Sequence, residues 1–171
     1  MPAYPNILQA TDAHRPAVEA LFREYLEWVC PIIYREYQVR FDPAAFVEHD
    51  MASLQIFSPP GGRLLLGYAE AALAGCACVR TLGPHLAEIK RMYVRPAYRR
   101  QGLGRALVDA CIEEMRAAGY ATLRLDSARF MTGAHALYQA AGFRPIGPYP
   151  ESEIPEEFRQ HWVFMERALN A

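Results

Sequence analysis

A glycine-rich connection between an apolar segment and a helical pattern constrains this chain more than any other feature. The apolar segment ends at Val94, and Arg99, Arg100, Gly102 and Gly104 follow before the helical pattern begins. Glycine lets backbone amides approach a ligand because no Cβ stands in the way. Free N–H groups at a helix start attract anions, and arginines add fixed positive charge. The stretch therefore predicts a strand, a loop and a helix whose backbone holds a polyphosphate.

The charge balance limits the partners that such a loop can serve. The 171-residue chain carries 18 basic and 19 acidic side chains, for a formal net charge of −1. General nucleic-acid binding needs a basic field, so we expect no nucleic-acid partner. No apolar run reaches the length of a membrane-spanning helix, and the first residues lack the pattern of a secretion signal. We therefore expect no membrane association.

The cysteines indicate a reducing compartment. None of them forms a Cys-x-x-Cys pair, and Cys76 and Cys78 share one face of a predicted strand. Scattered cysteines of this kind are typical of reduced thiols in a protein core. We therefore expect a cytoplasmic protein with no metal site.

The hydrophobic periodicity predicts one domain, residues 1–171, of the α+β class. Helical spacing predicts helices at residues 13–29, 42–54, 101–118 and 132–141, the first of them ended by Pro31. Strands are predicted at residues 7–10, 63–69, 73–81, 86–94, 122–127, 144–149 and 162–168. This order favours an α/β sandwich around one mixed, mostly antiparallel sheet of about seven strands flanked by four helices. The link rich in proline and glutamate that precedes residue 162 is expected to be exposed.

The strict alternation of a strand fails between residues 86 and 94. Ala87 and Ile89 share a face, but Met92 and Val94 lie odd steps beyond Ile89 and would point the other way. A β-bulge between residues 89 and 92 would restore one face and free backbone groups to bind an extended ligand. The alternative is a strand buried on both faces without a bulge.

Three segments together resemble the GNAT superfamily of acyl-CoA N-acyltransferases. They are Glu88-Ile-Lys-Arg-Met-Tyr-Val94, then Arg99-x-x-Gly102-x-Gly104, then Ala134-x-x-Leu-Tyr138-x-x-x-Gly142-Phe143. The order of elements fits that fold over nearly the whole chain. Two other glycine loops do not fit, because the P-loop has lysine where this chain has Arg105, and the dinucleotide fingerprint has a third glycine where this chain has Leu107.

The resemblance implies acetyl-CoA as co-substrate. In the family the pantetheine arm bonds the backbone of the bulged strand, and the pyrophosphate sits on the loop amides. The thioester enters the gap where the sheet splays, here toward Leu125 and Asp126. Met131 stands where many members carry asparagine, so Ser127 or Thr132 would have to supply that polar contact. The implied cofactor-binding residues are Met92, Tyr93, Val94, Arg99, Arg100, Gln101, Gly102, Leu103, Gly104 and Arg105.

The resemblance also implies the chemistry, in which a neutral amine attacks the thioester carbonyl. A freed N–H near Met92 would stabilise the oxyanion. Tyr138 occupies the motif position of the tyrosine that protonates the CoA sulfur, and its alternative role is a core aromatic. Glu88 is the candidate general base, and its alternative role is an ion pair across the sheet. His85 and His135 are rival bases, each with the alternative of a packed or surface histidine.

The acceptor site is expected between the first two helices, their link and the loop 148–161. Aromatic and acidic side chains in these segments suit a cationic amine, although a solvated acidic face is the alternative. We expect a small-molecule amine as acceptor; the competing hypotheses are a protein N-terminus or lysine, and a CoA-binding sensor without turnover. The resemblance adds that two copies could form a homodimer. The candidate substrate-binding residues are Trp28, Tyr34, Asp126 and Tyr149.

Overall fold

The structure is a computed structural model that describes residues 6–170. One seven-stranded sheet, in the order β1-β2-β3-β4-β5-β7-β6, runs through them. The strands are β1 (Asn6–Gln9), β2 (Arg63–Ala69), β3 (Ala72–Gly83), β4 (Leu86–Val94), β5 (Thr122–Ala128), β6 (Arg144–Ile146) and β7 (Trp162–Ala168). The helices are α1 (Arg15–Tyr37), α2 (Pro43–Ala52), α3 (Leu103–Ala117) and α4 (Thr132–Ala140). The predicted α+β class and mixed, mostly antiparallel sheet are confirmed.

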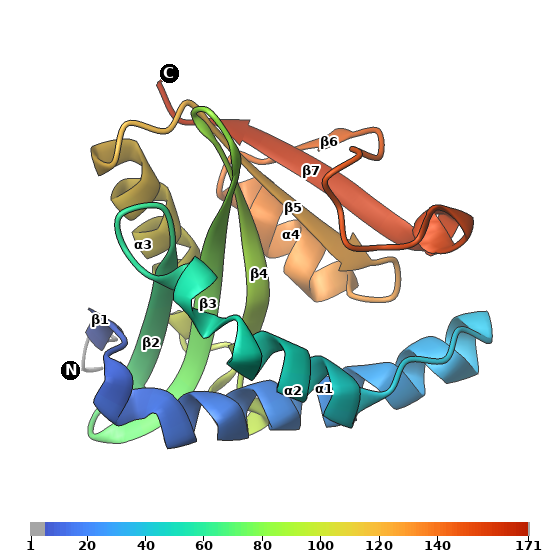
Figure 1. Cartoon of the computed structure of the whole chain (residues 1–171), viewed down its shortest axis with the longest axis horizontal. Helices are drawn as coiled ribbons and strands as arrows, with labels where there is room; N and C mark the ends of the chain where they lie inside the picture. The colour runs from blue at the N-terminus through green and yellow to red at the C-terminus, as the bar shows by residue number, and fades with distance from the viewer. Residues whose placement is uncertain (1–5, 171) are drawn as a thin grey trace.

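The helices form two layers, one on each face of the sheet (Figure 1). Helices α1 and α2 pack on one face through a core that includes Phe22 and Cys76. Helices α3 and α4 cover the other face through a core that includes Leu107 and Leu123. Cys76 and Cys78 lie in the first core and Ala77 in the second, as strand alternation requires. All four cysteines are buried and free of disulfides, which agrees with the predicted core thiols.

The predicted bulge in β4 is present. In the register with β3, Cys76 lies opposite Tyr93 and Cys78 lies opposite Lys90. Two β4 residues, Arg91 and Met92, therefore face a single β3 residue, and Arg91 has a φ of +50°. Because of the bulge, Ala87 and Ile89 point to the same face of the sheet as Met92 and Val94.

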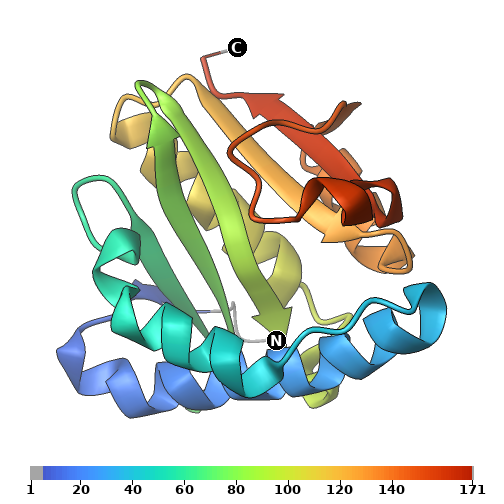
Figure 2. The same cartoon turned by 45° about the vertical axis from the view of Figure 1, so that its right-hand side comes forward.

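The sheet opens beyond this bulge. Strands β4 and β5 run parallel, but they pair only from Leu86 to Ile89 with Thr122 to Leu125. Strand β5 instead keeps its whole length paired with β7. Figure 2 shows β4 and β5 meeting at one end and diverging at the other. Within the described part of the chain, the backbone edge of β4 that would face β5 therefore has no strand partner after Ile89.

Helix α1 is longer than the sequence predicts, because it continues through Pro31 to Tyr37. A proline inside a helix removes one N–H and crowds the carbonyl four residues earlier, here that of Glu27. Both Pro31 and Glu27 are exposed, so water can reach that carbonyl. The apolar face meanwhile continues with Val29, Cys30 and Ile33, which are buried. Packing of this apolar face against the sheet therefore outweighs the tendency of Pro31 to end the helix.

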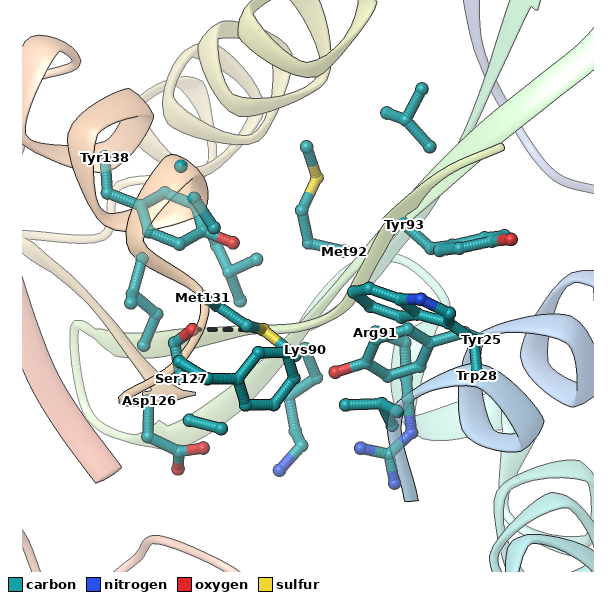
Figure 3. A pocket seen from close by; sticks show the side chains of 18 of the residues that line it. Tyr25, Trp28, Lys90, Arg91, Met92, Tyr93, Asp126, Ser127, Met131 and Tyr138 are labelled. Carbon is teal, nitrogen blue, oxygen red and sulfur yellow. Dashed lines mark hydrogen bonds between the residues drawn. The ribbon is translucent and has the colours of Figure 1, made fainter. Parts of the chain in front are cut away.

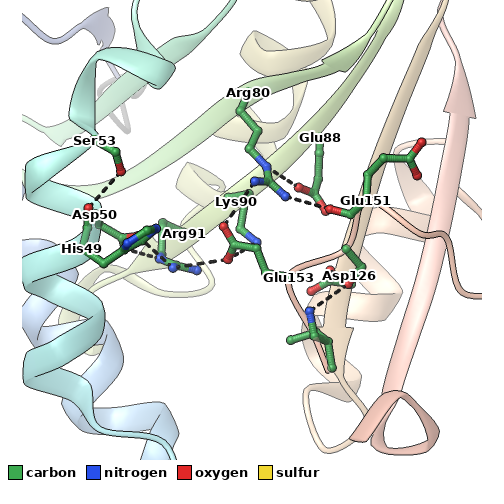
Figure 4. A network of polar contacts seen from close by, with 12 residues as sticks. His49, Asp50, Ser53, Arg80, Glu88, Lys90, Arg91, Asp126, Glu151 and Glu153 are labelled. Atoms are coloured by element: carbon green, nitrogen blue, oxygen red, sulfur yellow. Dashed lines mark hydrogen bonds and ion pairs between the residues drawn. The ribbon is translucent and has the colours of Figure 1, made fainter. Parts of the chain in front are cut away.

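The link before β7 is not simply exposed, as the sequence suggested. β6 ends at Ile146 rather than 149, and residues 149–155, which we call the strap, fold back over the sheet (Figure 4). Tyr149 and Ser152 in the strap are buried. The Glu153 carboxylate lies 2.6 Å from the Lys90 ammonium and 3.3 Å from the Arg80 guanidinium. Polar contacts to β3 and β4 therefore hold down a segment that looks like a solvated loop in sequence.

Within residues 6–170, no helix combines the length and the apolarity that crossing a bilayer requires.

The charges around Glu153 make its contribution to stability dependent on pH. Burial opposes its ionisation, but Lys90, Arg91 and Arg80 outweigh burial and lower the pKa of Glu153 below its ordinary 4.5. The stability from the ionised form is therefore present above pH 4.5 and is lost as the pH falls through the lowered, folded-state pKa.

We expect Glu153→Gln to lower the free energy of unfolding by about 1–3 kcal/mol at pH 7, because buried Lys90 loses its ionised partner. The difference from wild type should shrink toward zero below pH 4.5, as measured by denaturant unfolding at several pH values. Glu151→Gln is the control, since the Glu151 carboxylate lies 3.8 Å from Arg124 and 38% of its side chain is exposed. Equal losses in both variants, or a difference that does not change with pH, would contradict this role.

Candidate active site

A cavity of about 740 Å³ occupies the opening between β4 and β5. Its walls are α1, the second half of β4, the loop before α3, the end of β5, the start of α4 and the strap. Figure 3 shows the side chains that project into it from these elements. The cavity therefore lies where the sequence predicted the thioester to enter.

The loop before α3 presents backbone donors to one end of this cavity. Arg100 and Gly102 have φ values of +61° and +87°, the left-handed region that a tight turn into the helix requires. In the part of the chain that the structure describes, the main-chain N–H groups of residues 100–105 donate to no other main-chain group. The start of α3 also has no side-chain cap. These amides form a donor surface at a helix N-terminus, and surfaces of this kind attract anions.

Gly104 lets this donor surface approach α4. A Cβ at position 104 would lie 3.2 Å from Cδ2 of Leu137, closer than ordinary contacts allow. Any side chain there would also project toward Met92 and Val94, which line the cavity. Glycine at this position therefore avoids a tight contact with Leu137 and leaves the amides accessible.

Most of the predicted cofactor-binding residues line the cavity. Gln101 and Leu103 do not, because Leu103 is buried in the core and the Gln101 side chain donates to the Ala97 carbonyl at 3.0 Å. Their main-chain amides still belong to the donor surface. The residues brought to the cavity wall are Met92, Tyr93, Val94, Arg99, Arg100, Gly102, Gly104 and Arg105.

Arg99 is tied into the wall rather than left free. Its Nε donates to the Val94 carbonyl at 2.9 Å, and its guanidinium lies 4.9 Å from the ring centre of Trp28. Trp28 also packs edge-on against Phe130, with ring centres 6.2 Å apart. Arg99 and Trp28 together join the loop to α1 at the mouth of the cavity.

Tyr138 directs its hydroxyl into the cavity from α4 (Figure 3). Its ring also packs against Phe143, with ring centres 6.0 Å apart, so the core-aromatic role named as the alternative is present. Burial raises the pKa of the Tyr138 phenol well above its ordinary 10. The hydroxyl therefore keeps its proton at neutral pH and can donate it.

Glu88 lies next to the cavity but not on its wall. Its side chain has no exposure, and its carboxylate accepts from Arg80 Nε at 2.7 Å and from the Tyr149 hydroxyl at 2.8 Å. The cross-strand ion pair named as the alternative is thus present. Burial raises the pKa of Glu88, the charge of Lys90 opposes that rise, and the charge of Asp126 adds to it. A role as base would require water to connect Glu88 with the cavity.

The candidate substrate residues divide into two groups. Trp28 and Asp126 line the cavity, whereas Tyr34 and Tyr149 do not. Tyr34 is exposed under the Arg40 guanidinium, which lies 4.2 Å from its ring centre. Tyr149 is buried and turns toward Glu88.

The two histidines also differ in position. His85 Nδ1 lies 3.0 Å from the Gly119 carbonyl oxygen, away from the cavity. His135 Nε2 lies 3.2 Å from the Ser127 hydroxyl, and Ser127 is on the cavity wall. Burial lowers the pKa of His135. The Ser127 hydroxyl is also 3.4 Å from the Met131 sulfur, so Ser127 lies beside the position where an asparagine was expected.

Tyr25, Lys90 and Arg91 also line the cavity and were not singled out as site residues from the sequence. The Tyr25 hydroxyl points into the cavity from α1, and burial raises the pKa of Tyr25 to about 12. Lys90 and Arg91 lie at the bulge, and Arg91 forms two bonds to Asp50, of 2.5 and 3.0 Å. Lys90 and Arg91 are two adjacent cationic residues inside a strand, at the point where alternation breaks. That pattern is the signal that could have identified them from the sequence.

No cluster of three metal-ligating side chains occurs among residues 6–170.

Comparison with known proteins places these features in one family. A family model described as "Acetyltransferase (GNAT) family" matches residues 20–143. An uncharacterised N-acetyltransferase of Schizosaccharomyces pombe is 35% identical over 112 residues, which cover 64% of this chain and 69% of that protein. An IAA acetyltransferase of Azospirillum brasilense is 32% identical over 124 residues, which cover 70% of this chain and 76% of that protein. The structure of PaiA N-acetyltransferase from Thermoplasma acidophilum in complex with coenzyme A superposes with a TM-score of 0.74 at 17% identity, covering 96% of this chain and 99% of that one.

Proposed function

The chain belongs to the GNAT family of acetyltransferases and is therefore an acetyl-CoA-dependent N-acetyltransferase; we propose that its acceptor is the primary amine of a small molecule. The amine would attack acetyl-CoA directly while both substrates are bound. The observation that carries the proposal is the run of amides at residues 100–105 without main-chain acceptors in the described part of the chain, which borders a cavity of about 740 Å³ that also reaches the strap and β7. We propose further that residues 1–171 act as one cytoplasmic domain, in keeping with the single sheet and the free cysteines.

The cofactor is proposed to bind along two backbone surfaces. The pyrophosphate would accept hydrogen bonds from the amides of residues 100–105, with Arg100 and Arg105 beside it. The pantetheine arm would follow the edge of β4 that β5 leaves unpaired after Ile89, as an added strand does. The coenzyme A in the Thermoplasma acidophilum structure supports the fit of such a ligand to this fold.

The acetyl group would then lie in the opening between Met92 and Tyr138. The main-chain N–H of Met92, which belongs to the bulge, would donate to the carbonyl oxygen as it becomes negative. The amine nitrogen bonds to the carbonyl carbon, and the carbon–sulfur bond breaks. The departing thiolate takes the Tyr138 proton, which solvent replaces.

The attacking amine must also lose a proton. Glu88 is proposed to accept it, because burial holds its pKa above the ordinary range. Since Glu88 has no atom on the cavity wall, water would carry the proton to it. Its bonds to Arg80 and Tyr149 hold the carboxylate in one position for that transfer.

A small acceptor is favoured by the way the far end of the cavity is walled. Phe41 from the α1–α2 link, Ile154 and Pro155 from the strap, and Trp162 at the start of β7 all line that end. These elements come from distant parts of the chain and surround the space that an acceptor would occupy. A peptide would need an open groove across the same elements.

A thiol-release assay with acetyl-CoA tests the proposed acceptor class directly. We expect thiol release with small primary amines and little release with peptides that carry a free N-terminus or lysine. Release with peptides alone would contradict the proposal, and binding of acetyl-CoA without turnover on any acceptor would indicate a sensor.

The donor surface before α3 can be tested with Gly104→Glu. The substitution should abolish acetyl-CoA binding in calorimetry, because it places bulk and negative charge where the pyrophosphate is expected. Gly147→Glu is the matched control, since position 147 is exposed and a Cβ there has no neighbour within 4 Å. Unchanged affinity in Gly104→Glu, with a folded protein by circular dichroism, would count against the loop assignment.

Tyr138→Phe separates the two roles of this ring. The phenylalanine keeps the contact with Phe143 and removes the proton, so kcat should fall by about 10²- to 10⁴-fold while the KM for acetyl-CoA changes little. Thermal unfolding of the same variant provides the control. A loss of stability that accounts for the loss of activity would support a packing role instead.

A further inference from the structure

We infer that the acceptor is a monoamine with an apolar body of about the size of an aromatic ring, and that Asp126 holds its ammonium group. The inference rests on the proposed function and specifies the substrate class of the same site. It follows from the charges and the apolar surfaces at the acceptor end of the cavity.

The charged groups at this end are mostly neutralised by one another (Figure 4). The Lys90 ammonium lies 2.6 Å from the Glu153 carboxylate, and the Arg91 guanidinium binds both oxygens of Asp50. Lys90 is only 7% exposed and Asp50 only 4%, so these ion pairs belong to the protein interior rather than to its solvated surface. A substrate carboxylate would have to break one of these pairs to gain a cation.

Asp126 is the exception among the carboxylates that line the cavity. Within residues 6–170, no Lys, Arg or His nitrogen lies within 4.0 Å of its carboxylate oxygens. It accepts one hydrogen bond, from the Ser152 hydroxyl at 2.8 Å. A carboxylate has room for several donors, so Asp126 retains acceptor capacity for an ammonium group.

The position of Asp126 suits an amine that reacts with the thioester. Leu125 is the last β5 residue that pairs with β4, so Asp126 is the first residue beyond the point where the strands part. In Figure 3 Asp126 projects from the β5 side of the cavity, and Lys90 and Arg91 project from the β4 side. An ammonium bound by Asp126 would therefore sit at the base of the opening that the acetyl group is proposed to enter. It would first give one proton to solvent, which leaves the neutral amine that attacks, and the proton lost after the attack is the one that passes through water to Glu88.

The surface around the rest of this end is apolar. Phe41 packs edge-on against Phe46 at 5.5 Å and against Trp162 at 6.2 Å, and all three line the cavity. Val29, Ile33 and Ile154 complete this wall. Removing an apolar group of ring size from water favours binding, and a polar acceptor would not gain this contribution.

The acidic side chains expected to recruit a cation lie elsewhere. Glu27, Glu36 and Glu48 are exposed, and neither they nor Glu151 line the cavity. The second lining carboxylate, Glu153, is already paired with Lys90. Among the described residues, the cavity wall therefore offers one carboxylate without a cationic partner, which matches one ammonium and not the two or more of a polyamine.

A panel of acceptors on the wild-type protein tests the substrate class. The acceptors are 2-phenylethylamine, ethanolamine, spermidine, phenylalanine and a peptide with a free N-terminus, each with saturating acetyl-CoA. We expect kcat/KM to be highest for 2-phenylethylamine, and at least about tenfold above ethanolamine, given the apolar area buried.

The outcomes of this panel distinguish a failure of the inferred apolar monoamine from a failure of the proposed small-molecule function. A preference for ethanolamine, spermidine or phenylalanine would overturn the inference and leave the proposed small-molecule function intact. Transfer to the peptide alone, or to none of the acceptors, would overturn both.

Asp126→Asn tests the anchor. It keeps an acceptor for the Ser152 hydroxyl but removes the charge, so the KM for 2-phenylethylamine should rise about 10- to 100-fold while the KM for acetyl-CoA stays the same. Glu27→Gln is the control, because Glu27 is exposed on α1 and lies outside the cavity wall. An unchanged amine KM in Asp126→Asn, or an equal rise in both variants, would overturn the assignment. A rise in both KM values with a lower melting temperature would indicate a structural role and overturn it too.

Discussion

The parting of β4 and β5 is the constraint on which the rest of this structure depends. Parallel pairing ends at Ile89 and Leu125, and the bulge at Arg91 and Met92 follows at once on β4. A bulge bends a strand and increases its twist, so β4 turns away while β5 stays paired with β7. The divergence creates the cavity, exposes a backbone edge for a ligand and carries Met92 and Tyr138 to opposite sides of one space. A regular ladder in the same place would leave no room between the two strands.

Burial of charge shapes the same region. Lys90, Arg91, Asp50, Glu88 and Glu153 all lie near the opening, and each has an ionised partner within 4.0 Å. Unpaired charges at this depth would cost several kcal/mol each, so the pairs keep the opening polar without leaving it strongly charged. They also tie the strap and α2 to the central strands, which couples the acceptor wall to the sheet. Among residues 6–170, the Asp126 carboxylate has one side-chain partner, the neutral Ser152 hydroxyl. An incoming ammonium would give Asp126 an oppositely charged partner, as the other charged groups here already have.

Local patterns were sufficient to predict what depends on neighbouring residues. The strands Arg63–Ala69, Leu86–Val94 and Trp162–Ala168 have the predicted bounds, and the failed alternation at Met92 identified the bulge. The loop before α3 was also predictable, because two glycines and the helix start lie within a few residues of one another. Features that depend on contacts between distant residues were missed. The strap looked exposed because its anchors, Tyr149 to Glu88 and Glu153 to Lys90, join residues more than sixty positions apart. Pro31 looked like a helix end because the buried face that continues past it is visible only once α1 packs on the sheet.

The environment of Glu88 shows why residues at such a site resist assignment to a single role. Its carboxylate joins Arg80 on β3 and Tyr149 in the strap, so it holds the acceptor wall in place whether or not it accepts a proton. Removing it would leave the Arg80 guanidinium and the Tyr149 hydroxyl with fewer partners and would loosen the strap near Asp126. Activity could then fall through the position of the amine rather than through the loss of a base. The two causes differ in pH dependence, because a missing base removes the acid limb from the rate profile, whereas a displaced strap raises the KM of the amine at every pH.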